Sequence, residues 1–147
     1  MNPRFSQVAL LCPEATTGGP EALHQLAHTI NHLGGNARMA YFGAKSRVHL
    51  LPDRIRAETA PDTPGLSAYA AYAPQLVQEM VFGPDTLLVF PEISVQQARE
   101  VQAGNKAVWW LSVDNALSQN PNLRYRSYLE YLFADDSLVH FYQSDYA

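Results

Sequence analysis

Short apolar runs alternate along the chain with longer segments of helical period. The first run, within residues 6–12, has no polar alternation, which is typical of a strand covered on both faces of a sheet. Similar runs recur at regular intervals, and we predict strands over residues 6–12, 37–42, 86–90, 106–111 and 138–142.

The segment at residues 20–33 carries the clearest helical pattern. Pro20 suits the first turn of a helix, and the glycine pair at 34–35 suits its end. Its apolar residues share one stripe: Leu23, Leu26, Ala27, Ile30 and Leu33. Further helices are predicted over residues 74–82, 94–103 and 122–133.

A long polar stretch separates the second strand from the next predicted helix. Residues 43–73 are interrupted by Pro52, Pro61, Pro64 and Gly65, so we predict mostly loop. Loops of this length are usually functional or mobile. The stretch is therefore either an excursion into a substrate site or a loosely held surface strap.

Helices between successive strands favour parallel pairing, because right-handed crossovers return the chain to the same sheet edge. We predict an α/β domain over residues 1–147, a three-layer Rossmann-like open parallel sheet of about five strands with helices on both faces. Such sheets bind ligands beyond the carboxyl ends of their strands. The segments expected there are residues 13–19, 43 onward, 91–92, 112–115 and 143–144.

Composition narrows the classes of function. The 147 residues are 47% apolar and 16% charged, enough for one domain with its own core. The net charge of −4, without any basic cluster, argues against nucleic acid as a partner. No apolar run approaches the roughly 20 residues that span a bilayer. The N-terminus lacks a secretory pattern, so we expect a cytoplasmic protein.

A glycine pair joins the first predicted strand to the first predicted helix. Gly18 and Gly19 could let backbone N–H groups approach an anion at the positive end of that helix. The segment is neither G-x-G-x-x-G nor the lysine-containing P-loop. It therefore indicates either a phosphate-binding turn or an ordinary tight turn.

Three segments resemble one enzyme family in the same order along the chain. GGPEALHQL at residues 18–26, followed by LGGNA at 33–37, resembles the opening of GT-B fold glycosyltransferases. KAVWWLSVDN at 106–115 resembles a segment of bacterial surface-polysaccharide glycosyltransferases. HFYQSDYA at 140–147 resembles the strand and helix start before the crossover between the two domains of these enzymes.

The resemblance covers the N-terminal, acceptor-side half of a two-domain enzyme. It implies transfer of a sugar from a nucleotide-sugar donor, bound mainly by a C-terminal domain outside this chain, to a glycan acceptor in polysaccharide biosynthesis. It implies no separate cofactor, a cytoplasmic location that can be peripheral to the inner membrane, and little activity for this half alone. An exposed interdomain face predicts self-association. The alternative is a non-catalytic α/β module that pairs with a separate partner domain.

Three carboxylates near the predicted crevice could act as a general base toward an acceptor hydroxyl: Glu14, Glu92 and Asp114. We favour Asp114, followed by Glu92, because burial at a strand end could raise the pKa of Asp114 toward a useful value. The alternative for Asp114 is a turn-capping role. Glu14, Ser112 and Asn115 are expected to contact the substrate.

Aromatic side chains offer surfaces for sugar rings. Adjacent strand residues point to opposite faces, so Trp109 and Trp110 cannot line one pocket together, and both are expected to serve mainly in packing. Tyr69 and Tyr72, in the long loop, are better placed to touch an acceptor.

Three histidines recur at helical spacing in the first helix. His24, His28 and His32 could place two rings on one Zn²⁺, but no carboxylate partner is evident, so we predict no metal site. They are expected to flank the apolar stripe. His24 lies nearest the glycine pair and matches the Leu-His-Gln of the resembled family, so we expect it to contact the substrate. The single Cys12 ends a buried strand and is expected to be a core residue.

Overall fold

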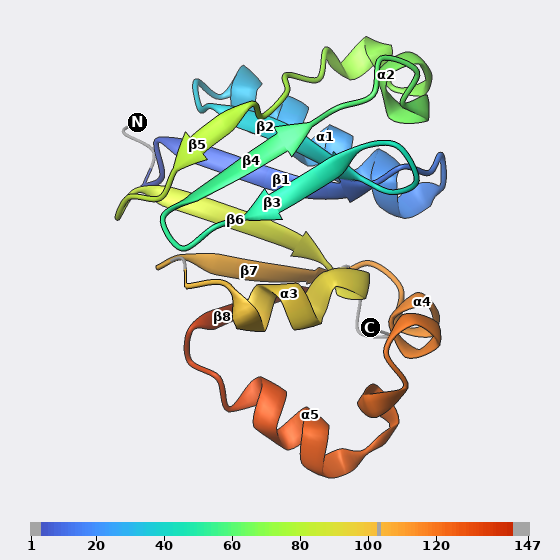
Figure 1. The fold of residues 1–147 in the computed structure, drawn as a ribbon, viewed down its shortest axis with the longest axis vertical. Helices are drawn as coiled ribbons and strands as arrows, with labels where there is room; N and C mark the ends of the chain where they lie inside the picture. Colours follow the sequence, from blue (N-terminus) through green and yellow to red (C-terminus); the bar gives the residue numbers. More distant parts are fainter. Residues whose placement is uncertain (1–3, 103, 143–147) are drawn as a thin grey trace.

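The computed structural model of the chain describes residues 4–102 and 104–142. Its centre is a five-stranded parallel sheet in the order β2-β1-β6-β7-β8 (Figure 1). The strands are β1 (Gln7–Pro13), β2 (Ala37–Phe42), β6 (Thr86–Pro91), β7 (Lys106–Trp110) and β8 (Leu138–Tyr142). The predicted Rossmann-like open sheet is confirmed, and each predicted strand agrees with the structure to within one residue at either end.

Helices cover both faces of this sheet because alternate residues of each strand point to opposite sides. Val8 and Leu10 of β1 pack with α1 (Gly18–His32) in one apolar cluster. Ala9 and Leu11 point the other way and share a second cluster with α3 (Val95–Glu100) and α5 (Arg126–Phe133). The three-layer prediction holds for these helices.

The long stretch predicted as loop contains regular structure. β3 (Arg47–Leu50) and β4 (Arg54–Glu58) pair with β5 (Glu79–Val81) in an antiparallel sheet of order β3-β4-β5. Figure 1 shows this small sheet lying over the main sheet. Ile55 and Met80 are buried against the same face as α3. Residues 54–58 alternate polar with apolar side chains, a strand signal that the surrounding prolines conceal.

The helix predicted over residues 74–82 is wrong. Met39 of β2 donates its N–H to the Gln75 carbonyl at 2.7 Å, and its own carbonyl accepts the Val77 N–H at 2.9 Å. These bonds hold the segment extended beside β2 before it enters β5. The apolar residues Val77 and Met80 are three positions apart, a spacing also found on one face of a helix. The pairing of this segment with β2 and β4 nevertheless makes it extended.

The remaining helices differ in extent from the predictions. α3 begins after the short turn η2 (Glu92–Ser94) and ends at Glu100. The segment predicted as one helix over 122–133 is divided into η3 (Pro121–Arg124) and α5. Three short helical elements lie outside every predicted helix: α2 (Pro64–Ala68), η1 (Ala70–Tyr72) and α4 (Val113–Gln119).

The two tryptophans of β7 lie on opposite faces of the sheet, as the strand period predicts. Trp110 is 5% exposed in the cluster below α3 and α5, and its indole N–H donates to Nδ1 of His140 at 3.0 Å. Trp109 packs, partly buried, on the α1 side. Cys12 is fully buried beneath α1, and burial raises the pKa of its thiol to about 12, which agrees with its prediction as a core residue.

Candidate functional site

The winding of the sheet changes direction between β1 and β6. The chain leaves β1 through α1 on one face and leaves β6 through α3 on the other. The loops that follow these two adjacent strands therefore diverge, and a crevice opens at their carboxyl ends. A pocket of about 190 Å³ lies there. It is lined by the loop after β1, the segment after β6, Leu111 and one side of α4: Pro13, Ala15, Thr17, Gly19, Pro20, Leu23, Pro91, Glu92, Ile93, Leu111, Asn115, Ser118 and Gln119.

Glu92 is the carboxylic acid that lines this crevice. It follows β6 directly and is 4% exposed. One carboxyl oxygen accepts the Leu111 N–H at 3.2 Å, which ties the end of β6 to the end of β7. Burial disfavours the charged form and raises the pKa of Glu92 above its usual value. The crevice thus contains a desolvated acid beside a polar helix face.

The two residues of the glycine pair lie in different environments, one in the wall of the crevice and the other exposed to solvent. Gly19 lines the pocket together with Pro20, so the positive N-terminal end of α1 borders it. Gly18 is exposed and is not a lining residue. This arrangement can favour an anion or an oxygen that carries partial negative charge.

The predicted cluster at residues 112–115 begins α4, and its members have different roles. Ser112 is the N-cap, and its hydroxyl accepts the Asn115 N–H at 3.2 Å. Asn115 lines the crevice. Asp114 is exposed in the first turn of α4 and is not a lining residue, so the expectation that it is buried is wrong. Its place in a helical first turn exposes the carboxylate, and Glu92 occupies the position that Asp114 was expected to hold.

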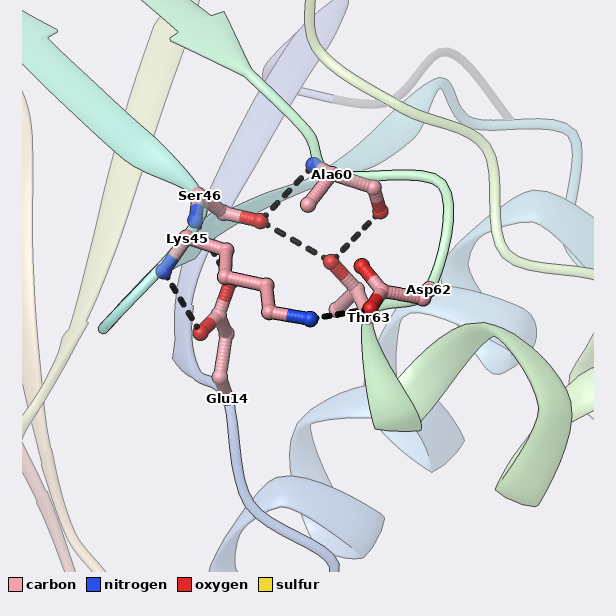
Figure 2. A network of polar contacts seen from close by, with 6 residues as sticks. All are labelled: Glu14, Lys45, Ser46, Ala60, Asp62 and Thr63. Atoms are coloured by element: carbon pink, nitrogen blue, oxygen red, sulfur yellow. Dashed lines mark hydrogen bonds and ion pairs between the residues drawn. The ribbon is translucent and has the colours of Figure 1, made fainter.

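Glu14 binds a neighbouring loop instead of facing the crevice. Its carboxylate accepts the backbone N–H groups of Lys45, at 3.2 Å, and Ser46, at 2.6 Å. Figure 2 shows these bonds and the hydroxyl pair behind them, where Ser46 Oγ lies 2.9 Å from Thr63 Oγ1. Lys45 also forms an ion pair with Asp62. The loop after β2 is therefore fixed to the segment before α2.

Replacing Glu14 should destabilise this loop. Glu14→Ala leaves two backbone N–H groups without their acceptor, and we expect a loss of about 1–2 kcal/mol in the free energy of unfolding. These hydrogen bonds lower the pKa of Glu14 below its usual 4.5. The stability that they add is present above pH 4.5 and is lost as the pH falls through the pKa of the folded protein.

Urea unfolding at neutral and acidic pH measures this effect of Glu14. Asp136→Ala is the control, since Asp136 is an exposed carboxylate outside the network. Equal losses for both variants, or a Glu14→Ala loss that persists unchanged in acid, would contradict the account of Glu14 as an acceptor for the loop.

His24 lies in the core, although it was expected to flank the apolar stripe. It is 1% exposed. Its Nδ1–H donates to the Pro20 carbonyl at 2.6 Å, and its Nε2 lies 2.5 Å from the hydroxyl of Tyr41, which donates to it. Both ring nitrogens are thus occupied, so His24 joins α1 to β2 and has no free atom for a substrate.

Tyr69 and Tyr72 pack on α1 and do not reach the crevice. Tyr69 is 7% exposed, its ring centroid lies 4.5 Å from that of His24, and its hydroxyl donates to the Thr17 carbonyl at 3.1 Å. The Tyr72 hydroxyl accepts from Gln25 at 3.1 Å and lies 3.3 Å from Glu21. The two tyrosines fasten α2 and η1 to α1, so their expected contact with an acceptor is not supported by their positions.

Other candidate features can be placed within residues 4–102 and 104–142. There, no three His, Cys, Asp or Glu side chains gather as a metal site requires. His28 and His32 stack on each other with centroids 6.3 Å apart. No helix in this part of the chain has the length and apolar character needed to cross a membrane. Residues 143–144, expected at the crevice, lie outside the described residues.

Sequence reasoning missed the contribution of α4 to the crevice. Ser118 and Gln119 line the pocket from its last turn. A signal for this helix is present in the sequence, because an N-cap serine is followed by Ala116 and Leu117 at helical spacing.

Comparison with known proteins found no match among protein-family models, curated proteins or solved structures.

Proposed function

We propose that this chain is the acceptor-side domain of a two-domain glycosyltransferase, which moves a sugar from a nucleotide-sugar donor to a glycan acceptor in polysaccharide biosynthesis. The observation that carries the proposal is the crevice between β1 and β6, where buried Glu92 lies beside the start of α1 and the polar side of α4. The three collinear sequence resemblances support the same function. In this proposal the donor is bound mainly by a second domain.

The chemistry follows from the acid and the shape of the crevice. An acceptor hydroxyl attacks the anomeric carbon of the donor, the bond from that carbon to the phosphate oxygen breaks, and the hydroxyl proton must leave. Ionised Glu92 can accept this proton if the hydroxyl comes within about 2.6–3.2 Å. Asn115 and Gln119 offer hydrogen bonds to the other sugar hydroxyls. If the enzyme retains configuration at that carbon, Glu92 orients the acceptor and the departing phosphate takes the proton.

Sugar binding by this chain tests the proposal directly. The ¹⁵N-labelled chain is titrated with methyl glycosides of glucose, galactose, mannose and N-acetylglucosamine, and amide shifts are followed by NMR. At least one glycoside should shift residues around 13–19, 91–93 and 111–119, and Glu92→Gln should reduce this response. Glu100→Gln, an equal charge change at an exposed residue at the end of α3, should not. Absence of shifts with every glycoside, or shifts away from the crevice, would overturn the proposal.

Glu92 should also affect stability, with a pH dependence opposite to that of Glu14. Burial raises the pKa of Glu92, so protonation of this carboxyl favours the folded protein over the unfolded chain. The stability that this provides is present below the usual pKa of 4.5 and is lost as the pH rises through the folded value. Glu92→Gln, which stays neutral, should therefore be at least as stable as the wild type at neutral pH, and its relative stability should decline in acid.

Thermal unfolding of the wild type and of Glu92→Gln from neutral to acidic pH tests this predicted change in relative stability. A variant that gains stability while losing glycoside response is typical of a binding group held at a cost in stability. A variant less stable than wild type at neutral pH and equal to it in acid would show that ionised Glu92 is a structural acceptor for the Leu111 N–H.

A second candidate function is a non-catalytic module that pairs with a partner domain. It is favoured by Val139 and Phe141, which lie on β8 and are 54% and 46% exposed. Together with Phe5 they line a pocket of about 280 Å³ away from the crevice. Reading the source gene beyond the Ala147 codon separates the candidates. A second α/β segment in the same reading frame supports the transferase, whereas an immediate stop codon favours the module.

A further inference from the structure

A third pocket, more apolar than the crevice, lies on the opposite side of α4 from it. Its volume is about 500 Å³, within the roughly 300–1,000 Å³ usual for small-molecule sites. α4, η3 and α5 enclose it together with the ends of β7 and β8, in the part of the chain that arches away from the sheet in Figure 1. Its aromatic walls come from Trp110, Phe133 and Tyr142.

The apolar lining is left partly open to solvent. Phe133 is 45% exposed and Tyr142 is 50% exposed, although both line the pocket. Leu117, Leu123 and Leu129 complete an aliphatic wall. Two of the eight large hydrophobic side chains that are exposed in the described residues, Phe133 and Tyr142, therefore line this one pocket. Exposed aromatic side chains gathered in an apolar hollow are typical of a binding surface.

One positively charged side chain lines this apolar pocket. Arg124 is the charged residue of the lining, it is exposed, and it forms no ion pair or hydrogen bond with another described side chain. The nearby Arg126, in contrast, pairs with Glu130 at 2.7 Å. An unpaired guanidinium beside an aliphatic and aromatic pocket matches a ligand that has an anionic group at one end and a hydrocarbon chain at the other.

We propose that this pocket binds an anionic amphiphile, with one hydrocarbon chain between α4 and α5 and the anionic group on Arg124. The assignment goes beyond sugar transfer and does not depend on it. α4 presents Val113, Ala116 and Leu117 to this pocket, whereas Asn115 and Ser118 line the crevice on its other side. A chain bound here therefore contacts the helix that forms one wall of the crevice.

Decyl phosphate, used below its micelle concentration, is the probe. Trp110 lines the pocket and Trp109 does not, so a Trp109→Phe background leaves one reporting indole of the two in the chain. We expect saturable binding, seen in tryptophan fluorescence and calorimetry with one site. Arg124→Gln should weaken it by roughly tenfold or more, as for other hydrogen bonds to charged groups. Decyltrimethylammonium has the same hydrocarbon chain and the opposite charge. Its affinity for the wild type should be no higher than the affinity of decyl phosphate for Arg124→Gln.

Two further variants test the location. Leu117→Trp places a larger side chain in the pocket and should abolish the binding measured by calorimetry, with circular dichroism to verify the fold. Arg126→Gln is the matched control and should bind decyl phosphate as the wild type does. The proposal is overturned if binding is absent, if Arg124→Gln binds like the wild type, or if the cationic probe binds equally well.

Vesicles identify the source of the amphiphile. Co-sedimentation with phosphatidylglycerol vesicles that decyl phosphate displaces and Leu117→Trp abolishes would support a bilayer lipid in this pocket. Decyl phosphate binding without co-sedimentation would support a free anionic amphiphile in the same pocket. Co-sedimentation that persists in Leu117→Trp, with no decyl phosphate binding by the wild type, would overturn the assignment of the pocket.

Discussion

His24→Ala should lower the free energy of unfolding by about 3–5 kcal/mol, because it combines a core cavity with two broken hydrogen bonds. The imidazole is 1% exposed, and its removal leaves the Tyr41 hydroxyl and the Pro20 carbonyl without their partner. Gly65 packs so closely that a Cβ there would lie 3.3 Å from the imidazole, so little space is available for repacking. Chemical denaturation measures the loss.

His28 provides the matched control for His24. It lies one turn further along α1, is exposed, and has its Nδ1 3.2 Å from the Tyr72 carbonyl. His28→Ala should cost less than about 1 kcal/mol, in the range usual for surface substitutions. If His24→Ala does not fold, His24→Gln and Tyr41→Phe remove part of the same network and should show intermediate losses. Similar costs for His24→Ala and His28→Ala would contradict the structural role of His24.

His24 should contribute to the pH dependence of the free energy of unfolding of the wild type. Burial lowers the pKa of His24 below its usual 6.5, so the folded protein favours the neutral ring. The stability gained in this way is complete above pH 6.5 and is lost as the pH falls through the folded pKa. Burial also lowers the pKa of His140, which adds an effect of the same sign. The decline of stability below pH 6.5 should be shallower in His24→Gln.

The central sheet could be predicted because buried parallel strands have a local signature. The apolar run of β1, the proline at its end and the glycine pair further along indicate both the strand and the loop after it. The antiparallel sheet could not be predicted in the same way. β3 and β4 are short, a proline separates them and two more follow them. Their stability comes from residues far away in the sequence, such as Met80.

The sequence predicts the position of the candidate site in the fold, but only some of the residues that form it. The rule for open α/β sheets places Gly19, Glu92 and Asn115 at one crevice, and all three line it. The rule says nothing about which way a side chain turns. Glu14 turns to the amide groups of the next loop, and His24 turns inward to Tyr41, so both have roles that only long-range contacts decide.

Ile55→Ala tests whether the stretch predicted as loop is part of the folded core. Ile55 lies in β4, is fully buried and packs in the cluster that joins the two sheets. Its truncation should lower the free energy of unfolding by about 2–4 kcal/mol, as for other buried isoleucines. In a loosely held strap the same change would cost less than about 0.5 kcal/mol. The size of the loss therefore distinguishes a folded part of the core from a loosely held strap.

Val81 of β5 is the control for Ile55, because it belongs to the same small sheet and is 53% exposed. Val81→Ala should cost less than about 1 kcal/mol. Hydrogen exchange adds a local measurement. The backbone N–H of Ala57, which donates to the Gln78 carbonyl at 3.0 Å, should exchange slowly in the wild type and faster in Ile55→Ala. Rapid exchange at Ala57 in the wild type, with a small loss for Ile55→Ala, would mean that the small sheet opens independently of the core.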